Sequence, residues 1–137
     1  MGNTLFAALQ ASASGLQAQS TRLRVIAENI ANADATGAAS GQDPYRRKTI
    51  TFESALDDAM GVELVGVERI GRDPSPFPVA YEPGHPAADE EGYVRRSNVD
   101  ALIEMVDMRE ASRSYEANLK SLEASRDMLA GALDLLR

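Results

Sequence analysis

The sequence predicts a mainly α protein, with long N- and C-terminal helices that pack as an antiparallel coiled coil and a small extended, β-rich middle segment. All six prolines lie between Pro44 and Pro86, while the flanks 3–33 and 99–136 hold one glycine each and no proline, so long helices are permitted only in the flanks. Apolar residues also recur every seven positions in each flank, as in a coiled-coil seam. The predicted parts are an N-terminal coiled-coil helix (1–33), a middle loop and small β element (34–97) and a C-terminal coiled-coil helix (98–137).

Two rows of residues in each flank, offset by three or four positions, fall on one stripe of a helix. The side chains expected to pack along these stripes are Leu5, Leu9, Leu16, Leu23, Ile26 and Ile30 in the first flank, and Met108, Tyr115, Leu119, Leu122, Leu129, Leu133 and Leu136 in the second. Asn98 is the expected cap of the C-terminal helix, and Asp100 places negative charge in its first turn. Helices of about 31 and 38 residues would be about 46 and 57 Å long. The middle segment is too short to cover both stripes, so we expect other subunits to cover them.

The middle segment is expected to form short strands joined by turns. Alternating polar and apolar residues indicate strands at 45–52 and 62–70, and a short edge strand is expected at 77–81. Pro83 and Gly84 suit a type II turn at the end of this edge strand. The run from Arg46 to Lys48 admits two interpretations, an edge strand whose charges discourage unwanted pairing or a docking patch for an acidic neighbour.

Composition excludes several classes of protein. The formal net charge of −7 disfavours nucleic-acid binding, and the absence of cysteine excludes disulfides and thiolate chemistry. Leu, Ile, Val and Phe together make up about a fifth of the chain, close to the level of roughly 20% expected of disordered chains. We therefore expect a chain that becomes ordered as it assembles.

No catalytic, cofactor-binding or metal-binding residue is expected. The best candidate is the run of His85, Asp89, Glu90 and Glu91, but prolines flank the histidine and no rigid element fixes the geometry of the four side chains. A solvated loop is the simpler interpretation. No uninterrupted apolar stretch is long enough to span a membrane, and the N-terminus does not have the pattern of a cleaved signal peptide.

Two segments carry longer motifs. Residues 28–37, Glu-Asn-Ile-Ala-Asn-Ala-Asp-Ala-Thr-Gly, contain Asn-x-Ala-Asn followed by Thr and Gly, and residues 112–118 read Ser-Arg-Ser-Tyr-Glu-Ala-Asn. Together with blocks between 81 and 106, they resemble the bacterial flagellar basal-body rod protein family, in particular its proximal rod type. The residues that carry the motifs are Asn29, Ala31, Asn32, Thr36, Gly37, Tyr115, Glu116, Ala117 and Asn118.

The resemblance implies a structural subunit, not an enzyme, of the proximal rod, the helical drive shaft that crosses the periplasm and transmits torque from the rotor ring to the hook. It implies export through the flagellar type III apparatus without a cleaved signal peptide. The implied partners are further copies, the rod subunits FlgB, FlgF and FlgG, and the ring–rod junction protein FliE. No cofactor, metal or nucleic acid is expected.

The resemblance also suggests roles for particular side chains. Asn29 and Asn32 lie where the first helix is expected to end, and their amides can bond the backbone groups released there. Tyr115 and Asn118 are expected to register the second helix against neighbouring subunits, because a buried tyrosine hydroxyl needs a partner. Two other functions stay open, a non-flagellar coiled-coil adaptor and a hydrolytic enzyme that uses the acidic loop 82–91.

Overall fold

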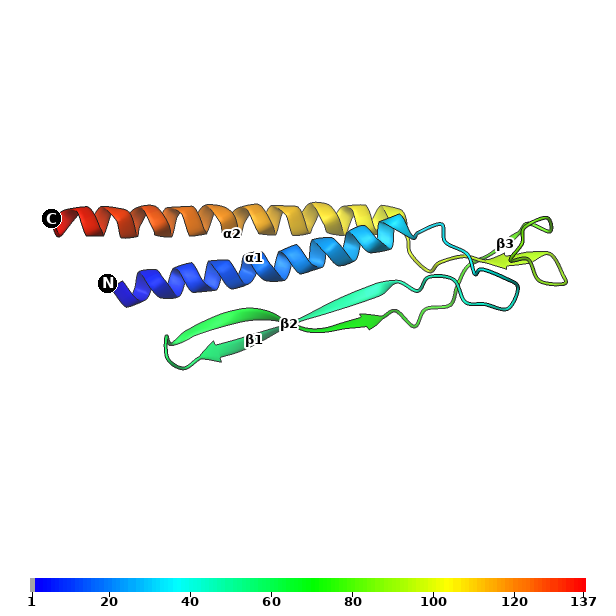
Figure 1. Cartoon of the computed structure of the whole chain (residues 1–137), viewed down its shortest axis with the longest axis horizontal. Coiled ribbons are helices and arrows are strands. Elements are labelled where there is room, and N and C mark those ends of the chain that lie inside the picture. The colour runs from blue at the N-terminus through cyan, green and yellow to red at the C-terminus, as the bar shows by residue number, and fades with distance from the viewer. Residues whose placement is uncertain (1) are drawn as a thin grey trace. The chain divides into compact units, whose positions relative to one another are not determined.

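The structure, a computed structural model, describes residues 2–137. The elements follow the order α1 (Gly2–Ala31), β1 (Lys48–Asp57), β2 (Val62–Arg72), β3 (Val79–Tyr81), β4 (Tyr93–Arg95) and α2 (Ala101–Leu135) (Figure 1). Two terminal helices and a β-containing middle were predicted, and this arrangement is confirmed. The chain forms two compact units. Unit 1 combines the chain before Arg24 with Thr51–Arg69 and Arg109–Arg137, and unit 2 combines Arg24–Ile50 with Ile70–Met108.

The ends of the helices are set by short polar side chains. α1 ends at Ala31, where the Asn32 side chain donates to the Glu28 carbonyl oxygen at 2.8 Å, an oxygen that also accepts the Asn32 backbone N–H at 3.2 Å. α2 begins at Ala101, and the Asp100 carboxylate accepts from the backbone N–H of Leu102 at 3.0 Å. Asp100 is therefore the N-cap, and the prediction that Asn98 caps α2 was wrong, because the Asn98 side chain bonds elsewhere in unit 2.

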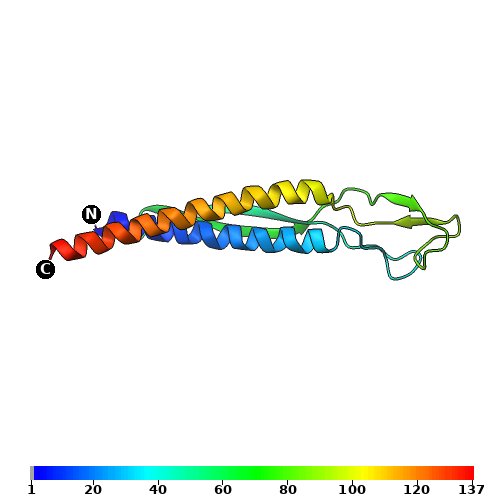
Figure 2. The same cartoon turned by 90° about the horizontal axis from the view of Figure 1, so that it is seen from above.

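In unit 1, segments of α1 and α2 lie side by side (Figures 1 and 2). The hydroxyl oxygens of Ser12 and Ser121 are 3.1 Å apart, and Arg22 lies 3.6 Å from Glu110. A Cβ built on Gly15 would fall 2.8 Å from the side-chain amide of Asn118, so the helices approach closely there. Small and polar residues therefore make close contacts between the two helices in unit 1.

Ile26, one of the predicted stripe residues, is buried in unit 2, whereas the buried helical residues of unit 1 are smaller than the stripe leucines. The helical residues of unit 1 that are buried are Ser12, Gly15, Ala18, Ala111 and Ser125. The predicted leucines at 9, 16, 23, 122 and 129 are half-buried, as are Met108 and Tyr115. In α2 the buried row is Glu104, Ala111 and Ser125, one position before the predicted row that contains Leu119. The helices pack more closely than leucines would allow, because small residues bring two backbones together.

Leu133 and Leu136 are exposed, with 57% and 84% of their surface accessible, and Leu136 follows the last residue of α2.

The strands β1 and β2 form a two-stranded sheet that is longer than predicted. Their four-residue connection requires an antiparallel hairpin, and it turns at Gly61, which has a φ of 64° that suits glycine. β1 begins three residues later than predicted and continues to Asp57. In unit 1 the hairpin is bonded to α1 by Gln10, which donates to Asp57 at 3.1 Å, and by Ser14, which accepts from the Val65 N–H at 3.2 Å.

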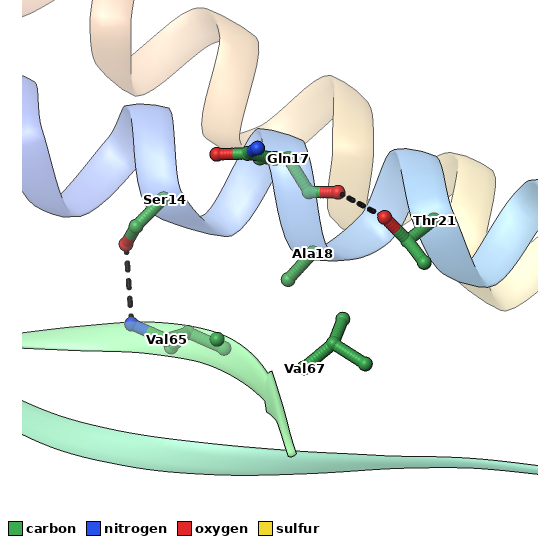
Figure 3. Close-up of a pocket in the computed structure, with 7 residues that line it drawn as sticks. Ser14, Gln17, Ala18, Thr21, Val65 and Val67 are labelled. Atoms are coloured by element: carbon green, nitrogen blue, oxygen red, sulfur yellow. Dashed lines mark hydrogen bonds between the residues drawn. The ribbon is translucent and has the colours of Figure 1, made fainter. Parts of the chain in front are cut away.

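A cavity of about 280 Å³ lies beside the contact between α1 and β2. Ala18 and Val67 face each other across it, and the Ser14–Val65 bond closes one side (Figure 3). Space is therefore left between the hairpin and α1 beside their two hydrogen bonds.

In unit 2, β3 and β4 pair antiparallel with Ala80 opposite Val94, a fully buried residue. β4 was not predicted from the sequence. A turn follows β3, where the His85 N–H donates to the Glu82 carbonyl oxygen at 3.0 Å. Among residues 2–137 only Gly41, Gly61 and Gly92 have positive φ. Gly84 lacks the positive φ of a type II turn, so the predicted turn type was wrong.

Candidate assembly site

Asn29, from the first longer motif, lies in the interior of unit 2 with 1% of its surface exposed. Its side-chain oxygen accepts from the Tyr45 hydroxyl at 2.7 Å and from the Lys48 N–H at 2.9 Å. Its NH₂ group donates to the Lys48 carbonyl oxygen at 2.9 Å and to Glu104 at 3.4 Å. All four hydrogen-bonding positions of the amide are used. Asn29 therefore holds the end of α1 to the first residue of β1 and to α2.

Glu104 is a carboxylate with 1% of its surface exposed, and Arg47 lies against it. The guanidinium donates from Nε to Glu104 and also lies 3.4 Å from Asp73 and 3.8 Å from Asp107. Burial opposes the charged form of Arg47, but the hydrogen bond and charge of Glu104, with those of Asp73, outweigh burial and raise the pKa of Arg47 above its ordinary value. Arg47 thus stays charged and compensates the buried carboxylate.

Asn98 joins the same cluster from the segment before α2. Its side-chain oxygen accepts from the Arg47 N–H at 2.7 Å, and its NH₂ group donates to the carbonyl oxygens of Asp73 and Ser75 at 3.1 Å. Hydrogen bonds from Ser75, with the nearby charge of Arg47, lower the pKa of Asp73 below its ordinary value. We name Asn29, Arg47, Asp73, Asn98 and Glu104 the polar cluster of unit 2.

The basic run that includes Arg47 is engaged inside unit 2, which matches neither interpretation from the sequence. Arg46 stacks over the Phe77 ring at 4.2 Å and donates to the Asp73 carbonyl oxygen at 2.8 Å. Lys48 forms an ion pair of 2.7 Å with Glu28, and its hydrogen bond lowers the pKa of that carboxylate. Sequence reasoning missed Glu104 as the partner, because an acidic residue in the first turn of a helix is also expected from the helix dipole.

The other motif residues fall into two groups. Thr36 forms a β-bridge with Arg96, and Gly37 is buried where a Cβ would meet the Gln42 carbonyl oxygen at 2.2 Å. Ala31, Glu116 and Ala117 are exposed, whereas Tyr115 and Asn118 are half-buried. The structure therefore brings Asn29, Asn32, Thr36 and Gly37 together in unit 2, and it places the second motif on α2 in unit 1.

The first two turns of α2 expose four large apolar side chains. Leu102, Ile103, Met105 and Val106 have 71%, 55%, 55% and 61% of their surface accessible. Successive residues of a helix are separated by 100°, so these four side chains are spread around the helix on the sides that Glu104 does not occupy. This part of α2 is therefore apolar on nearly every side. In unit 1, Leu119 and Met128 of α2 are also exposed. A helix of this kind needs a covering surface, which makes this end of α2 the candidate assembly surface.

The acidic loop considered for catalysis or metal binding forms turns. The Asp89 carboxylate accepts from the N–H of Glu91 and of Tyr93 at 2.9 and 2.8 Å, and His85 Nδ1 accepts from the Ala87 N–H at 3.0 Å. Between Gly2 and Arg137, no three His, Cys, Asp or Glu residues gather in a way that could hold a metal ion. Over the same range, neither helix is long and apolar enough to cross a membrane.

Comparison with known proteins identifies the family. Residues 9–38 match the family described as "Flagella basal body rod protein", and residues 90–135 match "Flagellar basal body rod FlgEFG protein C-terminal". The chain is 55% identical to the flagellar basal-body rod protein FlgC of Agrobacterium fabrum over 97% of this chain and 96% of that protein. It is 44% identical to FlgC of Salmonella typhimurium over 89% and 90%, and 38% identical to FlgC of Bacillus subtilis over 96% and 98%. The chain therefore belongs to the flagellar basal-body rod protein FlgC family.

Proposed function

We propose that this protein is a structural subunit of the bacterial flagellar basal-body rod, in its proximal part, and that it has no enzymatic activity. Its relatives are named as basal-body rod proteins, and the matches cover nearly the whole chain. As a rod subunit it transmits torque from the rotor ring to the hook, within a rod that crosses the periplasm. Family membership favours this role over a non-flagellar adaptor or a hydrolase.

The exposed apolar start of α2 is the observation that best supports assembly. Leu102, Ile103, Met105 and Val106 belong to a helix whose own unit leaves them uncovered. Removing such side chains from water is worth about 25 cal/mol per Å² of apolar surface, so covering four of them stabilises an assembly by several kcal/mol. We propose that neighbouring subunits pack over this surface.

The terminal helices supply the rest of the packing. The contacts Ser12–Ser121 and Gly15–Asn118 support an antiparallel coiled coil within the subunit, and the exposed residues Leu119, Leu133 and Leu136 support lateral contacts between subunits. We expect the parts 1–33 and 98–137 to assemble in this way, with the middle segment 34–97 between them.

The proposed neighbours are further copies of this chain, the rod subunits FlgB, FlgF and FlgG and the ring–rod junction protein FliE. Family membership supports other rod components as partners. Delivery is proposed to use the flagellar type III export apparatus without cleavage of a signal peptide. Sequencing the N-terminus of the chain in purified basal bodies tests this last point.

The experiment that tests the assembly surface replaces Met105 by Asp in a flagellated bacterium that lacks its own copy of the protein. The expected result is export of the chain without incorporation into basal bodies and without swimming, because a charge on the covered surface would be buried without a partner. The matched control is Ala124→Asp, which adds the same charge at an exposed position of α2 and removes no large apolar side chain. Normal rods with Met105→Asp would contradict the proposal.

Two half-buried leucines extend the test into the helix seam. Asp in place of Leu16 or Leu122 is expected to block incorporation and leave the exported monomer soluble. Circular dichroism of the free chain should report low helicity at low concentration and a rise as the chain associates. A fully helical chain that does not associate would contradict assembly-coupled ordering.

A further inference from the structure

In unit 1, the register between α1 and α2 has one sterically demanding contact, between Gly15 and Asn118. A Cβ on residue 15 would lie 2.8 Å from both Nδ2 and Oδ1 of Asn118, closer than real Cβ contacts. The Asn118 amide also donates to the Ser114 carbonyl oxygen of its own helix at 3.0 Å, which fixes its direction. Asn118 thus fills a notch that exists only because residue 15 has no side chain.

Apart from Gly15 and Asn118, the seam of unit 1 discriminates poorly between registers, whereas in unit 2 the buried Asn29–Glu104 bond joins α1 and α2 in the observed register. Ala111, Asn118 and Ser125 recur at intervals of seven along α2, and Ser12 lies in the same seam of α1. A shift of seven residues would bring Ala111 or Ser125 opposite Gly15, and either of these small residues fits the space. The fully buried residues of this seam are small and bury similar areas in registers seven residues apart, so their burial alone does not choose one.

Asn118 distinguishes the observed register from the two shifted ones. In the two shifted packings Asn118 would face Ala8 or Arg22. Each of these residues has a Cβ that would occupy the space taken by the Asn118 amide beside Gly15. Gly15 is the single glycine of α1 after Gly2, its first residue. In both shifted packings the Asn118 amide would have to leave its bond to the Ser114 carbonyl oxygen to avoid this Cβ, so the observed register is the one that keeps the bond.

We propose that Asn118 and Gly15 are positioning residues that select the register of α1 against α2. One polar side chain in a coiled-coil seam is a known means of fixing register at some cost in stability. The selected register decides which side chains of both helices stay exposed. This role lies within one chain and does not depend on the function proposed above.

Cysteine cross-linking measures the register directly, because the chain contains no natural cysteine. Cysteines at Ser12 and Ser121 report the observed register, since the two hydroxyl oxygens are 3.1 Å apart. Cysteines at Ser12 with Ser114, or at Ser12 with Met128, report the two registers shifted by seven residues. The full chain is oxidised at a concentration where circular dichroism reports helix, and intrachain disulfides are quantified by non-reducing electrophoresis and peptide mapping.

With Gly15 and Asn118 intact, the Ser12–Ser121 pair should cross-link in excess of each shifted pair by about tenfold, which corresponds to about 1.4 kcal/mol. Asn118→Ala should narrow this preference, and the buried Asn29–Glu104 bond of unit 2, which a shift of seven residues would break, should retain part of it. Ser125→Ala is the matched control, because it removes a polar group from the same row without a glycine contact, and it should keep the tenfold preference. A failure of the Ser12–Ser121 pair to cross-link, or an unchanged preference in Asn118→Ala, would overturn the proposal.

A second test moves the glycine of α1 from position 15 to position 8. The double variant Ala8→Gly, Gly15→Ala places the glycine seven residues earlier, so Asn118 fits only in the packing that Ser12 and Ser114 report. The yield of the Ser12–Ser114 cross-link should rise at the expense of the Ser12–Ser121 cross-link. Any other pattern in this variant, including the loss of all three cross-links, would count against register selection by Asn118.

Discussion

Asn29 bonds the backbone of Lys48 as a neighbouring strand would, since its side-chain oxygen accepts from the Lys48 N–H and its NH₂ group donates to the Lys48 carbonyl oxygen, both at 2.9 Å. The first backbone groups of β1 are thereby satisfied by a helix side chain instead of a third strand. This relationship gives the first asparagine of the motif a specific task. It also explains why a residue of similar shape cannot replace it.

Asn29→Asp is therefore expected to damage unit 2 severely. The new carboxylate keeps the shape of the amide but places an acceptor against the Lys48 carbonyl oxygen and against Glu104, so two acceptor pairs and a buried charge result. The expected loss is about 2–3 kcal/mol of unfolding free energy, measured by urea denaturation followed by circular dichroism. Asn32→Asp is the matched control, because Asn32 loses a single bond to the Glu28 carbonyl oxygen and is only half-buried. Equal losses in both variants would contradict the assigned role.

The fold class could be predicted from the sequence because proline and glycine restrict helices strongly, and their absence from the flanks is visible without a structure. The seam was predicted less well. Leucine periodicity marks residues such as Leu16 and Leu122 that lie beside the contact, whereas Gly15 and Ala111 make it, and small residues give no periodic hydrophobic signal. In α2 the buried row of Glu104, Ala111 and Ser125 lies one position before the predicted row that contains Leu119, and the packing of that predicted row against other subunits stays a prediction.

The polar cluster could be predicted only in part. The motif singled out Asn29, but nothing in the sequence shows that Arg47 and Glu104, which are 57 residues apart, meet in the interior. Long-range ion pairs depend on tertiary packing, and each partner alone has an ordinary explanation on a helix end or a strand edge. The same reason explains why Asn98 was taken for a helix cap.

Acid should weaken unit 2 through Asp73. The pKa of Asp73 is lowered below its ordinary value of 3.8, first by hydrogen bonds from Ser75 and then by the charge of Arg47. A carboxyl group with a lower pKa in the folded state stabilises that state above its unfolded pKa, and this contribution is lost as the pH falls from about 4 through the folded pKa. Asp73→Asn should reduce the unfolding free energy at pH 7 and flatten its decrease below about pH 4. An identical pH dependence in both proteins, measured by urea denaturation, would contradict this contribution.

Gly37→Ala is expected to distort the loop after α1. The added Cβ would lie 2.2 Å from the Gln42 carbonyl oxygen, and a backbone atom cannot move away as a flexible side chain can. The expected loss of unfolding free energy is about 1–3 kcal/mol, with reduced rod incorporation. Gly84→Ala is the matched control, because a Cβ at position 84 meets nothing within 4 Å and its φ is not positive. Equal behaviour of the two variants in denaturation would show that the close contact at Gly37 is relieved at little cost.

Glu104 and Arg47 provide a test of what the buried ion pair contributes. Glu104→Ala leaves the guanidinium beside a cavity, with Asp73 and Asp107 as its remaining partners at 3.4 and 3.8 Å, and it also removes an acceptor of Asn29. Breaking a buried pair by removing one partner costs about 3–5 kcal/mol. The double variant Glu104→Leu, Arg47→Met fills the space with apolar side chains and removes both charges, so it should lose much less, because the cost of burying two charges disappears with them. Urea denaturation of the two variants at pH 7 distinguishes these cases. If the double variant were as unstable as Glu104→Ala, the pair would stabilise unit 2 directly, and its charges could not be exchanged for packing.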